Sequence, residues 1–412
     1  MTKVTGQAVT FSVDKVAGRT SGLRRDPARN APDKTLAASR AHPREKHGAT
    51  IERRCRARGG AVGELRFATV GTSAICERFL EALATLPDAR HVAACSRSIE
   101  RARALAARSG AVLSFASLRD LARCDEVDAV YLATPNGLHA AQALELVEAG
   151  KHVLVEKPLA ANEREAREVF SAARRRGVVV LEGLRSLHVP AFSAIERVVA
   201  EELGAVRLVT LRFSKVTSRM ARLRAGERVN VFDPELAGGA LMDIGVYCVE
   251  PAVALFGAPD EVRALAVTVP APGCGAPVDL AGEALLGYGD KVVSLSFGKT
   301  SDDLAPCEVQ GERATLLWDH VSCPARLRVC AHEGTGGLAF RPETGAPVEL
   351  PVEEPADDMA CEVRDFVDAV RGVPAAVALR ERLEGVTLAS LRVMDEIRRQ
   401  IGVRFPADEG RA

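Results

Sequence analysis

Short apolar segments alternate with amphipathic stretches from Leu65 onward, and this alternation limits the fold of the chain more than any other feature. In the amphipathic stretches apolar side chains recur at the spacing of one helix face. Short strands that alternate with helices predict an α/β fold with a doubly wound parallel sheet. The expected strands are residues 65–71, 91–95, 112–115, 129–133, 152–155 and 178–182, and the expected helices are residues 74–83, 99–108, 118–122 and 138–149.

The pattern changes after about Arg185. Segments in which apolar and polar residues alternate predict strands with one face in a core, which is typical of antiparallel sheets. These strands are expected at residues 206–213, 261–269, 281–286, 292–297, 307–309, 314–318 and 326–330, with helices at 191–202, 238–255, 357–370 and 383–401. We therefore predict a first domain at residues 65–185 and a second α/β domain at 186–412, built on a large, mainly antiparallel sheet. Packing of the helix 383–401 back onto the first domain is left open.

Composition argues against several classes of protein. The net charge is zero, which argues against a nucleic-acid binder. No apolar run approaches the roughly 18–20 residues that span a bilayer, so we expect no membrane contact. The ten cysteines contain no C-x-x-C pair, and the histidines form no cluster at ligand spacing. This usage predicts reduced thiols, a cytoplasmic location and no metal site.

Residues 1–64 form a basic leader with more than twice as many Lys and Arg as Asp and Glu. The leader lacks periodicity and a secretory apolar core, and we expect it to be disordered and without a part in catalysis. An organellar presequence and a start at Val62 are alternatives, and acidic residues count against the first. Nucleic-acid binding by the leader is a third option, but no aromatic side chains are interleaved with its charges.

Glu156-Lys157-Pro158 closes one of the predicted parallel strands. In open α/β sheets, ligands bind at the carboxyl edge of the strands, where this tripeptide lies. Proline fixes its own φ and favours an extended conformation for the residue before it. We therefore expect Lys157 to be aimed at a ligand site.

The turn after the first strand, Gly71-Thr72-Ser73-Ala74-Ile75-Cys76, retains only the first glycine of G-x-G-x-x-G. Serine and cysteine are small, and a helix N-terminus still offers free N–H groups to a phosphate, so this turn suits a dinucleotide. A plain strand-to-helix turn is the alternative.

Ser96-Arg97-Ser98 follows the second strand, where an NAD site normally carries Asp or Glu. An arginine with flanking hydroxyls suits the 2′-phosphate of NADP, because a guanidinium forks onto phosphate oxygens. We therefore favour NADP over NAD, although Arg97 is also compatible with a solvated loop residue.

A further loop at the same predicted sheet edge reads Thr134-Pro135-Asn136-Gly137-Leu138-His139. Asn136 is expected to cap the next helix and to contact the cofactor. His139 lies in the first helical turn and is either a cofactor contact or a packed side chain.

Together these motifs resemble the Gfo/Idh/MocA family of NAD(P)-dependent oxidoreductases, and the match runs from Leu65 to the C-terminus. The other markers are Gly238–Tyr247, which reads GGALMDIGVY, and the ending at residues 397–408. The resemblance implies a Rossmann domain and a second domain whose open sheet often serves oligomerisation, so we expect a homodimer or higher oligomer. Many members carry histidine where this chain has Tyr247. The chain is in this respect similar to the glucose–fructose oxidoreductase, NADP-dependent xylose dehydrogenase and dimeric dihydrodiol dehydrogenase branch.

Asp243 and Tyr247 are four residues apart and would share one helix face. If this face looks across the cleft at Lys157, all three side chains meet at one carbon–oxygen bond. We expect Tyr247 to be the acid/base, Lys157 to lower its pKa and bind the substrate oxygen, and Asp243 to orient by accepting a hydrogen bond. Interdomain packing for Tyr247 and a structural hydrogen bond for Asp243 are the alternatives. Arg185 and His188, after the sixth strand, are further candidates for substrate contact.

These features predict an NADP(H)-dependent dehydrogenase. Its substrate would be a sugar, a polyol or a dihydrodiol, oxidised at a CH–OH carbon. Glu156 and Lys157 are included among the expected cofactor contacts. A non-catalytic dinucleotide sensor or scaffold of the same fold is the alternative, and the retention of Lys157 and Tyr247 favours the enzyme.

Overall fold

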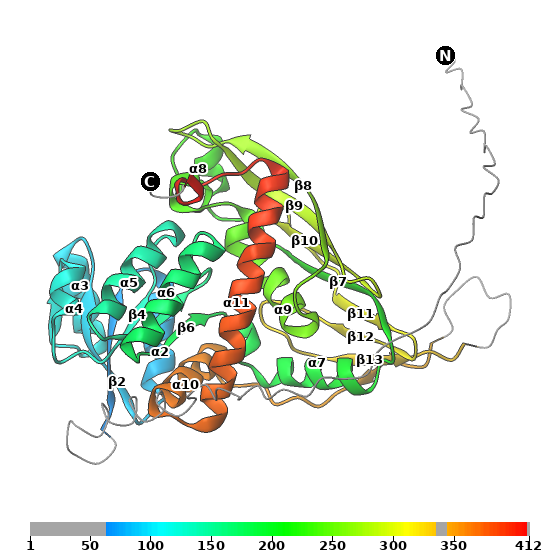
Figure 1. Ribbon diagram of the computed structural model, residues 1–412, viewed down its shortest axis with the longest axis horizontal. Coiled ribbons are helices and arrows are strands. Elements are labelled where there is room, and N and C mark those ends of the chain that lie inside the picture. The colour runs from blue at the N-terminus through cyan, green and yellow to red at the C-terminus, as the bar shows by residue number, and fades with distance from the viewer. Residues whose placement is uncertain (1–62, 335–343, 410–412) are drawn as a thin grey trace, which may run out of the picture. The chain divides into compact units, whose positions relative to one another are not determined.

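The computed structural model describes residues 63–334 and 344–409 (Figure 1). The predicted leader therefore lies almost entirely outside the described residues. The first sheet has six parallel strands in the order β3-β2-β1-β4-β5-β6. These are β1 (Leu65–Val70), β2 (Ala89–Cys95), β3 (Leu113–Phe115), β4 (Ala129–Leu132), β5 (His152–Glu156) and β6 (Val180–Gly183). This order is that of a doubly wound Rossmann sheet, and the prediction of the α/β fold is confirmed.

The strands of this sheet are buried on both faces. All four residues of β4 are buried, and only one residue of β1 is partly exposed. Helices cover the sheet, as its continuous apolar strands require. They are α2 (Ala74–Ala84), α3 (Ile99–Ser109), α4 (Leu118–Ala122), α5 (His139–Glu148) and α6 (Glu163–Arg176). The strand order reverses between β1 and β4, which opens a crevice at the carboxyl ends of the strands.

The second sheet has eight strands in the order β14-β13-β12-β11-β7-β10-β9-β8. Its strands are β7 (Val206–Ser214), β8 (Glu261–Pro270), β9 (Pro277–Gly287), β10 (Val292–Gly298), β11 (Cys307–Gly311), β12 (Ala314–Trp318), β13 (Arg328–Ala331) and β14 (Val348–Glu349). Every neighbouring pair is antiparallel except β7 and β10, which run parallel. The predicted, mainly antiparallel sheet is confirmed.

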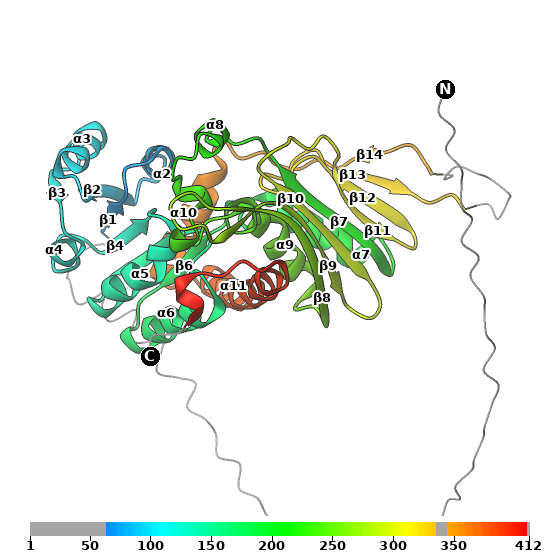
Figure 2. The ribbon, with the colours of Figure 1, turned by 90° about the horizontal axis from the view of Figure 1, so that it is seen from above.

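One face of this sheet carries helices. Elements α9 (Val246–Phe256) and α11 (Pro374–Ile401) pack against its strands (Figure 2). The side chains that alternate onto the opposite face of β7 to β10 are exposed, and several of them are large and apolar. These are Leu208, Leu265, Val267, Leu285 and Val292, which we call the outer apolar face.

The C-terminal helices return to the first sheet. Helix α10 (Asp358–Arg371) packs against α2, and α11 packs against α6 and β6 as well as against α9 and β8. Arg364 of α10 forms an ion pair of 3.0 Å with Asp88, just before β2. Helix α11 begins at Pro374 rather than at the predicted residue 383. The predicted division at residues 185/186 stays a prediction.

The predicted helix 238–255 begins with an irregular turn. Leu241–Gly245 form a π-helical turn that continues into α9. Before it, Gly239 has φ +135°, and a Cβ there would overlap the Asp279 carboxylate. That carboxylate accepts the Leu241 N–H at 2.6 Å, and burial raises the pKa of Asp279 to about 6. Such π-turns often lie at functional sites, and this one carries Asp243.

One described segment, Pro234–Phe256, is long and apolar enough to cross a membrane by length and composition. It includes the π-turn and α9. Within the protein, 78% of its most apolar window is buried, which is expected of a core helix.

Candidate active site

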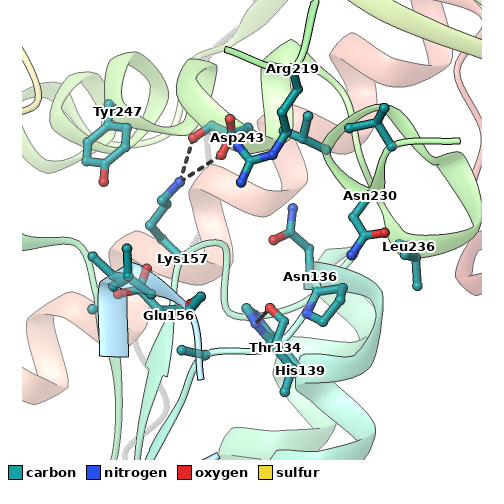
Figure 3. A pocket seen from close by; sticks show the side chains of 18 of the residues that line it. Thr134, Asn136, His139, Glu156, Lys157, Arg219, Asn230, Leu236, Asp243 and Tyr247 are labelled. Atoms are coloured by element: carbon teal, nitrogen blue, oxygen red, sulfur yellow. Dashed lines mark hydrogen bonds and ion pairs between the residues drawn. The ribbon is translucent and has the colours of Figure 1, made fainter. Parts of the chain in front are cut away.

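A cavity of about 590 Å³ lies at the carboxyl edge of the first sheet, between the two sheets (Figure 3). Its walls come from the turn after β1, the loop after β4, the end of β5, the segment 219–247 and helix α10. Most predicted site residues lie on these elements or on the turn after β6, whose Arg185 also lines the cavity. The predicted residues that line it are Ser73, Ala74, Ile75, Thr134, Pro135, Asn136, His139, Glu156, Lys157, Arg185, Asp243 and Tyr247.

Lys157, at the end of β5, contacts both Asp243 and Tyr247. Its ammonium donates hydrogen bonds to the Asp243 backbone oxygen at 2.6 Å and to the Asp243 Oδ1 at 3.3 Å. The same ammonium lies 5.0 Å from the centre of the Tyr247 ring. Burial opposes the charge of Lys157, but Tyr247 and Asp243 outweigh it and raise the pKa of Lys157. The lysine is therefore a fixed positive charge between a carboxylate and a phenol.

Asp243 is held by two lysines. Its Oδ2 accepts a hydrogen bond from Lys299, which directly follows β10. Burial pushes the pKa of Asp243 upward, but Lys157 and Lys299 outweigh it and lower that pKa to about 2. Sequence reasoning missed Lys299. The signal was present, because a lysine directly after an apolar strand was the same feature that identified Lys157.

Tyr247 is 8% exposed and packs edge-on against Phe213, with ring centres 5.6 Å apart. Lys157 lowers the pKa of Tyr247, as expected, but this effect does not decide the direction of the net shift. Burial raises the pKa of Tyr247, and Lys157 and Arg185 only partly offset this. The phenol is therefore the favoured form near neutral pH, and the lysine limits the cost of ionising it.

The turn after β1 fits a dinucleotide. Gly71 has φ +120°, and a Cβ there would overlap the Ala133 carbonyl, so this position requires glycine. Ser73 is the N-cap of α2 but its side chain makes no capping hydrogen bond. The first N–H groups of a helix have no partner within it, and Ser73, Ala74 and Ile75 line the cavity, so the start of α2 can accept a phosphate there. Gly71 and Thr72 lie behind the residues that line the cavity.

Arg97 and its neighbours lie at the end of β2, outside the cavity. The Arg97 side chain is exposed and has no hydrogen bond or ion pair within the part of the chain that is described. Ser98 caps α3 by accepting the Arg101 N–H, and the Ser96 hydroxyl accepts the Ser98 N–H. The guanidinium is thus free to bind a 2′-phosphate.

Replacing Arg97 with Ala is expected to weaken NADPH binding about 10- to 100-fold, because charge-assisted hydrogen bonds to the 2′-phosphate are lost. NADH affinity should stay unchanged. Fluorescence titration with each dinucleotide measures both values. The matched control is Arg90→Ala, because Arg90 is exposed on β2 and pairs with Glu64. Equal NADPH affinity in the Arg97 variant and the wild type would remove Arg97 from the cofactor site.

The loop after β4 differs in part from the prediction. Asn136 does not cap α5; its side-chain amide donates to the Ala237 carbonyl at 3.1 Å. A short 3₁₀ turn, Asn136–Leu138, separates it from the helix and makes capping impossible. Both ring nitrogens of the buried His139 lie within 2.9 Å of carbonyl oxygens, those of Pro158 and Thr134. Burial lowers the pKa of His139, and the two carbonyl contacts partly offset this, so His139 is a packed side chain that joins two loops.

The remaining predicted residues lie around the inner wall. Glu156 accepts the Tyr131 hydroxyl, and burial raises the pKa of Glu156. Arg185 forms an ion pair of 3.3 Å with Asp358 at the edge of the cavity. His188 does not line the cavity, and its buried ring pairs with Asp365 at 2.7 Å. The proposed substrate contact by His188 has no geometric basis.

Several lining residues were not foreseen. Glu362 of α10 is fully buried, and neither carboxyl oxygen has a hydrogen-bond partner among the described residues. Burial and the nearby Glu156 raise the pKa of Glu362 well above its ordinary value. The others come mainly from the long polar stretch after β7, and the polar ones among them are Arg219, Arg222, Arg228 and Asn230. Nothing in local periodicity predicts which residues of such a stretch face a cavity.

Comparison with known proteins agrees with this architecture. The family described as an oxidoreductase family with an NAD-binding Rossmann fold (GFO_IDH_MocA) matches residues 65–184. The C-terminal domain of the same family matches residues 193–317.

Relatives match over nearly their whole length. The scyllo-inositol 2-dehydrogenase (NADP(+)) IolU of Bacillus subtilis is 36% identical over 345 residues, which are 84% of this chain and 99% of that protein. The trans-1,2-dihydrobenzene-1,2-diol dehydrogenase of Sus scrofa is 28% identical and covers the same shares. The crystal structure of KijD10, a 3-ketoreductase from Actinomadura kijaniata in complex with NADP, is similar with a TM-score of 0.65 at 25% identity, over 84% of this chain and 100% of that one. The present chain therefore belongs to the GFO/IDH/MocA family of oxidoreductases.

Proposed function

We propose that this protein is an NADP(H)-dependent dehydrogenase that acts on a CH–OH carbon of a sugar, polyol or dihydrodiol-like substrate. The observation that supports it most strongly is the position of the Lys157 ammonium, between the Asp243 carboxylate and the Tyr247 ring in the cavity wall. The relatives named as NADP(+)-dependent inositol and dihydrodiol dehydrogenases support the same chemistry.

The cofactor would run along the carboxyl edge of the first sheet. Ser73, Ala74 and Ile75 would offer helix N–H groups to the diphosphate, and Arg97 would bind the 2′-phosphate. The loop at Thr134–Asn136 would border the nicotinamide half. When bound, NADP⁺ supplies the acceptor for the hydride of the substrate carbon. This assigns the Rossmann half to the cofactor and the face at Asp243 and Tyr247 to the substrate.

Tyr247 would transfer the proton. In oxidation its phenolate takes the proton of the substrate hydroxyl as the carbon–oxygen bond becomes a carbonyl. In reduction the phenol returns this proton. Lys157 stabilises negative charge on both oxygens, and Asp243 with Lys299 holds Lys157 in place. The raised pKa of Tyr247 favours proton donation at neutral pH and predicts faster oxidation in alkaline solution.

An assay of NADP⁺ reduction, read as absorbance near 340 nm, tests this function. The panel contains inositols, aldoses and dihydrodiols, and the reverse reaction is tested with the matching ketones and NADPH. Substrate-dependent turnover that prefers NADP(H) supports the proposal. Tight NADPH binding without turnover on any member of the panel would instead support a sensor or scaffold.

We further propose a homo-oligomer, which the outer apolar face supports, and a cytoplasmic location, which the absence of a C-x-x-C pair among the ten cysteines favours. Leu265 and Val267 are 83% and 62% exposed on adjacent outward positions of β8. Contiguous exposed apolar side chains on a sheet face are typical of an interface, and the resemblance to the family points to the same surface. Light scattering with size-exclusion chromatography should give at least twice the monomer mass, and Leu265→Glu should reduce it.

A further inference from the structure

Arg219 stands apart from the other cations around the cavity. It lies on the segment between β7 and the π-turn, and its side chain points from there into the cavity (Figure 3). Within residues 63–334 and 344–409 its guanidinium has neither a hydrogen bond nor a carboxylate partner. An arginine that enters a cavity without a counter-charge is arranged for an anion that comes with a ligand.

The other lining cations already have partners. Lys157 pairs with Asp243, and Arg185 pairs with Asp358. On the same segment as Arg219, Arg222 binds Glu227, and Arg228 binds Asp233 and Glu235. Their charges are compensated before any ligand arrives. Among the lysines and arginines that line the cavity in the described chain, Arg219 is therefore the one whose charge is unpaired.

The proposed cofactor brings an uncompensated anion. A dinucleotide diphosphate carries two negative charges, and the turn that would receive it, residues 71–76, contains no basic residue. The helix N-terminus of α2 supplies N–H groups and only a partial positive charge. Arg219 lines the same cavity as Ser73, Ala74 and Ile75, and its guanidinium would complete the neutralisation because its planar fork matches two phosphate oxygens.

We propose that Arg219 binds the diphosphate of the dinucleotide from the C-terminal half and so closes that half over the cofactor. This inference rests on the proposed function, since it requires NADP(H) in the cavity. The cofactor would then have two arginine contacts, each to a different phosphate group. Arg97 would recognise the 2′-phosphate that distinguishes NADP from NAD, and Arg219 would recognise the diphosphate that both share.

The two arginines therefore predict different binding profiles. Arg219→Gln should weaken NADPH and NADH alike, by about tenfold each, because the diphosphate is common to both. ADP-ribose, which contains the diphosphate but no nicotinamide, should weaken by the same factor. Arg97→Ala should weaken NADPH alone. In the double variant the two losses should multiply, because the two arginines would bind different phosphates and share no partner.

Isothermal titration calorimetry of the full chain measures these affinities. Arg224→Gln is the matched control, because Arg224 is exposed at the end of helix α8 (Met220–Arg224), which directly follows Arg219, and does not line the cavity. Arg219→Ala repeats the test with a smaller side chain, and circular dichroism checks that each variant is folded.

Wild-type affinity for NADPH, NADH and ADP-ribose in the Arg219 variants would overturn the inference and leave the proposed function intact. A loss for NADPH and NADH with none for ADP-ribose would overturn it as well, because Arg219 would then contact the nicotinamide half. Unchanged cofactor affinity with a raised KM would assign Arg219 to the substrate instead. Failure of the wild type to bind any dinucleotide would overturn the proposed function, and the inference with it.

Discussion

Tyr247→Phe lowers kcat by about 10²- to 10⁴-fold while NADPH affinity stays at the wild-type level: this is the expected result if Tyr247 transfers the proton. Phenylalanine keeps the ring that packs against Phe213 and lies over the Lys157 ammonium. The substitution thus removes one hydroxyl and little packing. Steady-state kinetics and a fluorescence titration of the same preparation give both quantities.

A second tyrosine provides the control. Tyr288 donates its hydroxyl to the Gly257 carbonyl at 3.1 Å and does not line the cavity. Tyr288→Phe should leave kcat unchanged. If Tyr247→Phe turned over as fast as this control, Tyr247 would be a packing residue, as its burial also permits.

Lys157→Met should lower kcat by about 10²- to 10³-fold, the usual cost of removing one fixed electrostatic contact to the reacting oxygen. It should also shift the pH dependence of oxidation. The lysine lowers the pKa of Tyr247 against the effect of burial, so its removal raises that pKa further. Oxidation needs the phenolate, and the pH of half-maximal kcat/KM should therefore move to higher values.

The pH–rate profile of the variant in the oxidation direction measures this shift. Lys291→Met is the control, because Lys291 pairs with Asp290 away from the cavity. A Lys157 variant that loses rate with an unchanged profile would show that the lysine binds substrate without acting on Tyr247.

The parallel sheet was predictable from the sequence because its strands are buried on both faces. Continuous apolar runs such as Val153-Leu154-Val155 in β5 contrast sharply with their surroundings. Helix α6 was missed. Its sequence, EREAREVFSAARRR, is dominated by charge, and only a stripe of apolar side chains is buried: Ala166, Val169, Phe170, Ala172 and Ala173.

For the second domain, the sequence predicted a mainly antiparallel sheet with helices, but not the strand bounds or the strand pairing. The strand β9 is four residues longer at its start than expected, since residues 277–280 lack clear alternation. The parallel pairing of β7 with β10 joins segments about 80 residues apart, and no local pattern encodes it. The π-turn at Leu241–Gly245 depends on the distant Asp279, which holds the Leu241 N–H.

Site residues were predictable where they follow the end of a strand or are spaced to share one face of a helix. Lys157, Asp243 and Tyr247 lie together, as predicted, because the end of a strand and the face of a helix can both be recognised from local sequence. Their catalytic roles remain predictions. Asn136 was wrong as a helix cap because its partner, Ala237, lies 101 positions away. Arg219 lines the cavity and Lys299 binds Asp243 through long-range contacts, which sequence periodicity does not report.

Binding of NADPH and of NADH to the folded wild type, measured by fluorescence titration, tests the account most directly. The account predicts saturable binding of both, with NADPH at least about tenfold tighter because of the 2′-phosphate contact at Arg97. Binding of neither dinucleotide by folded protein would contradict it, because the turn at Gly71–Ser73 would then not be a cofactor site.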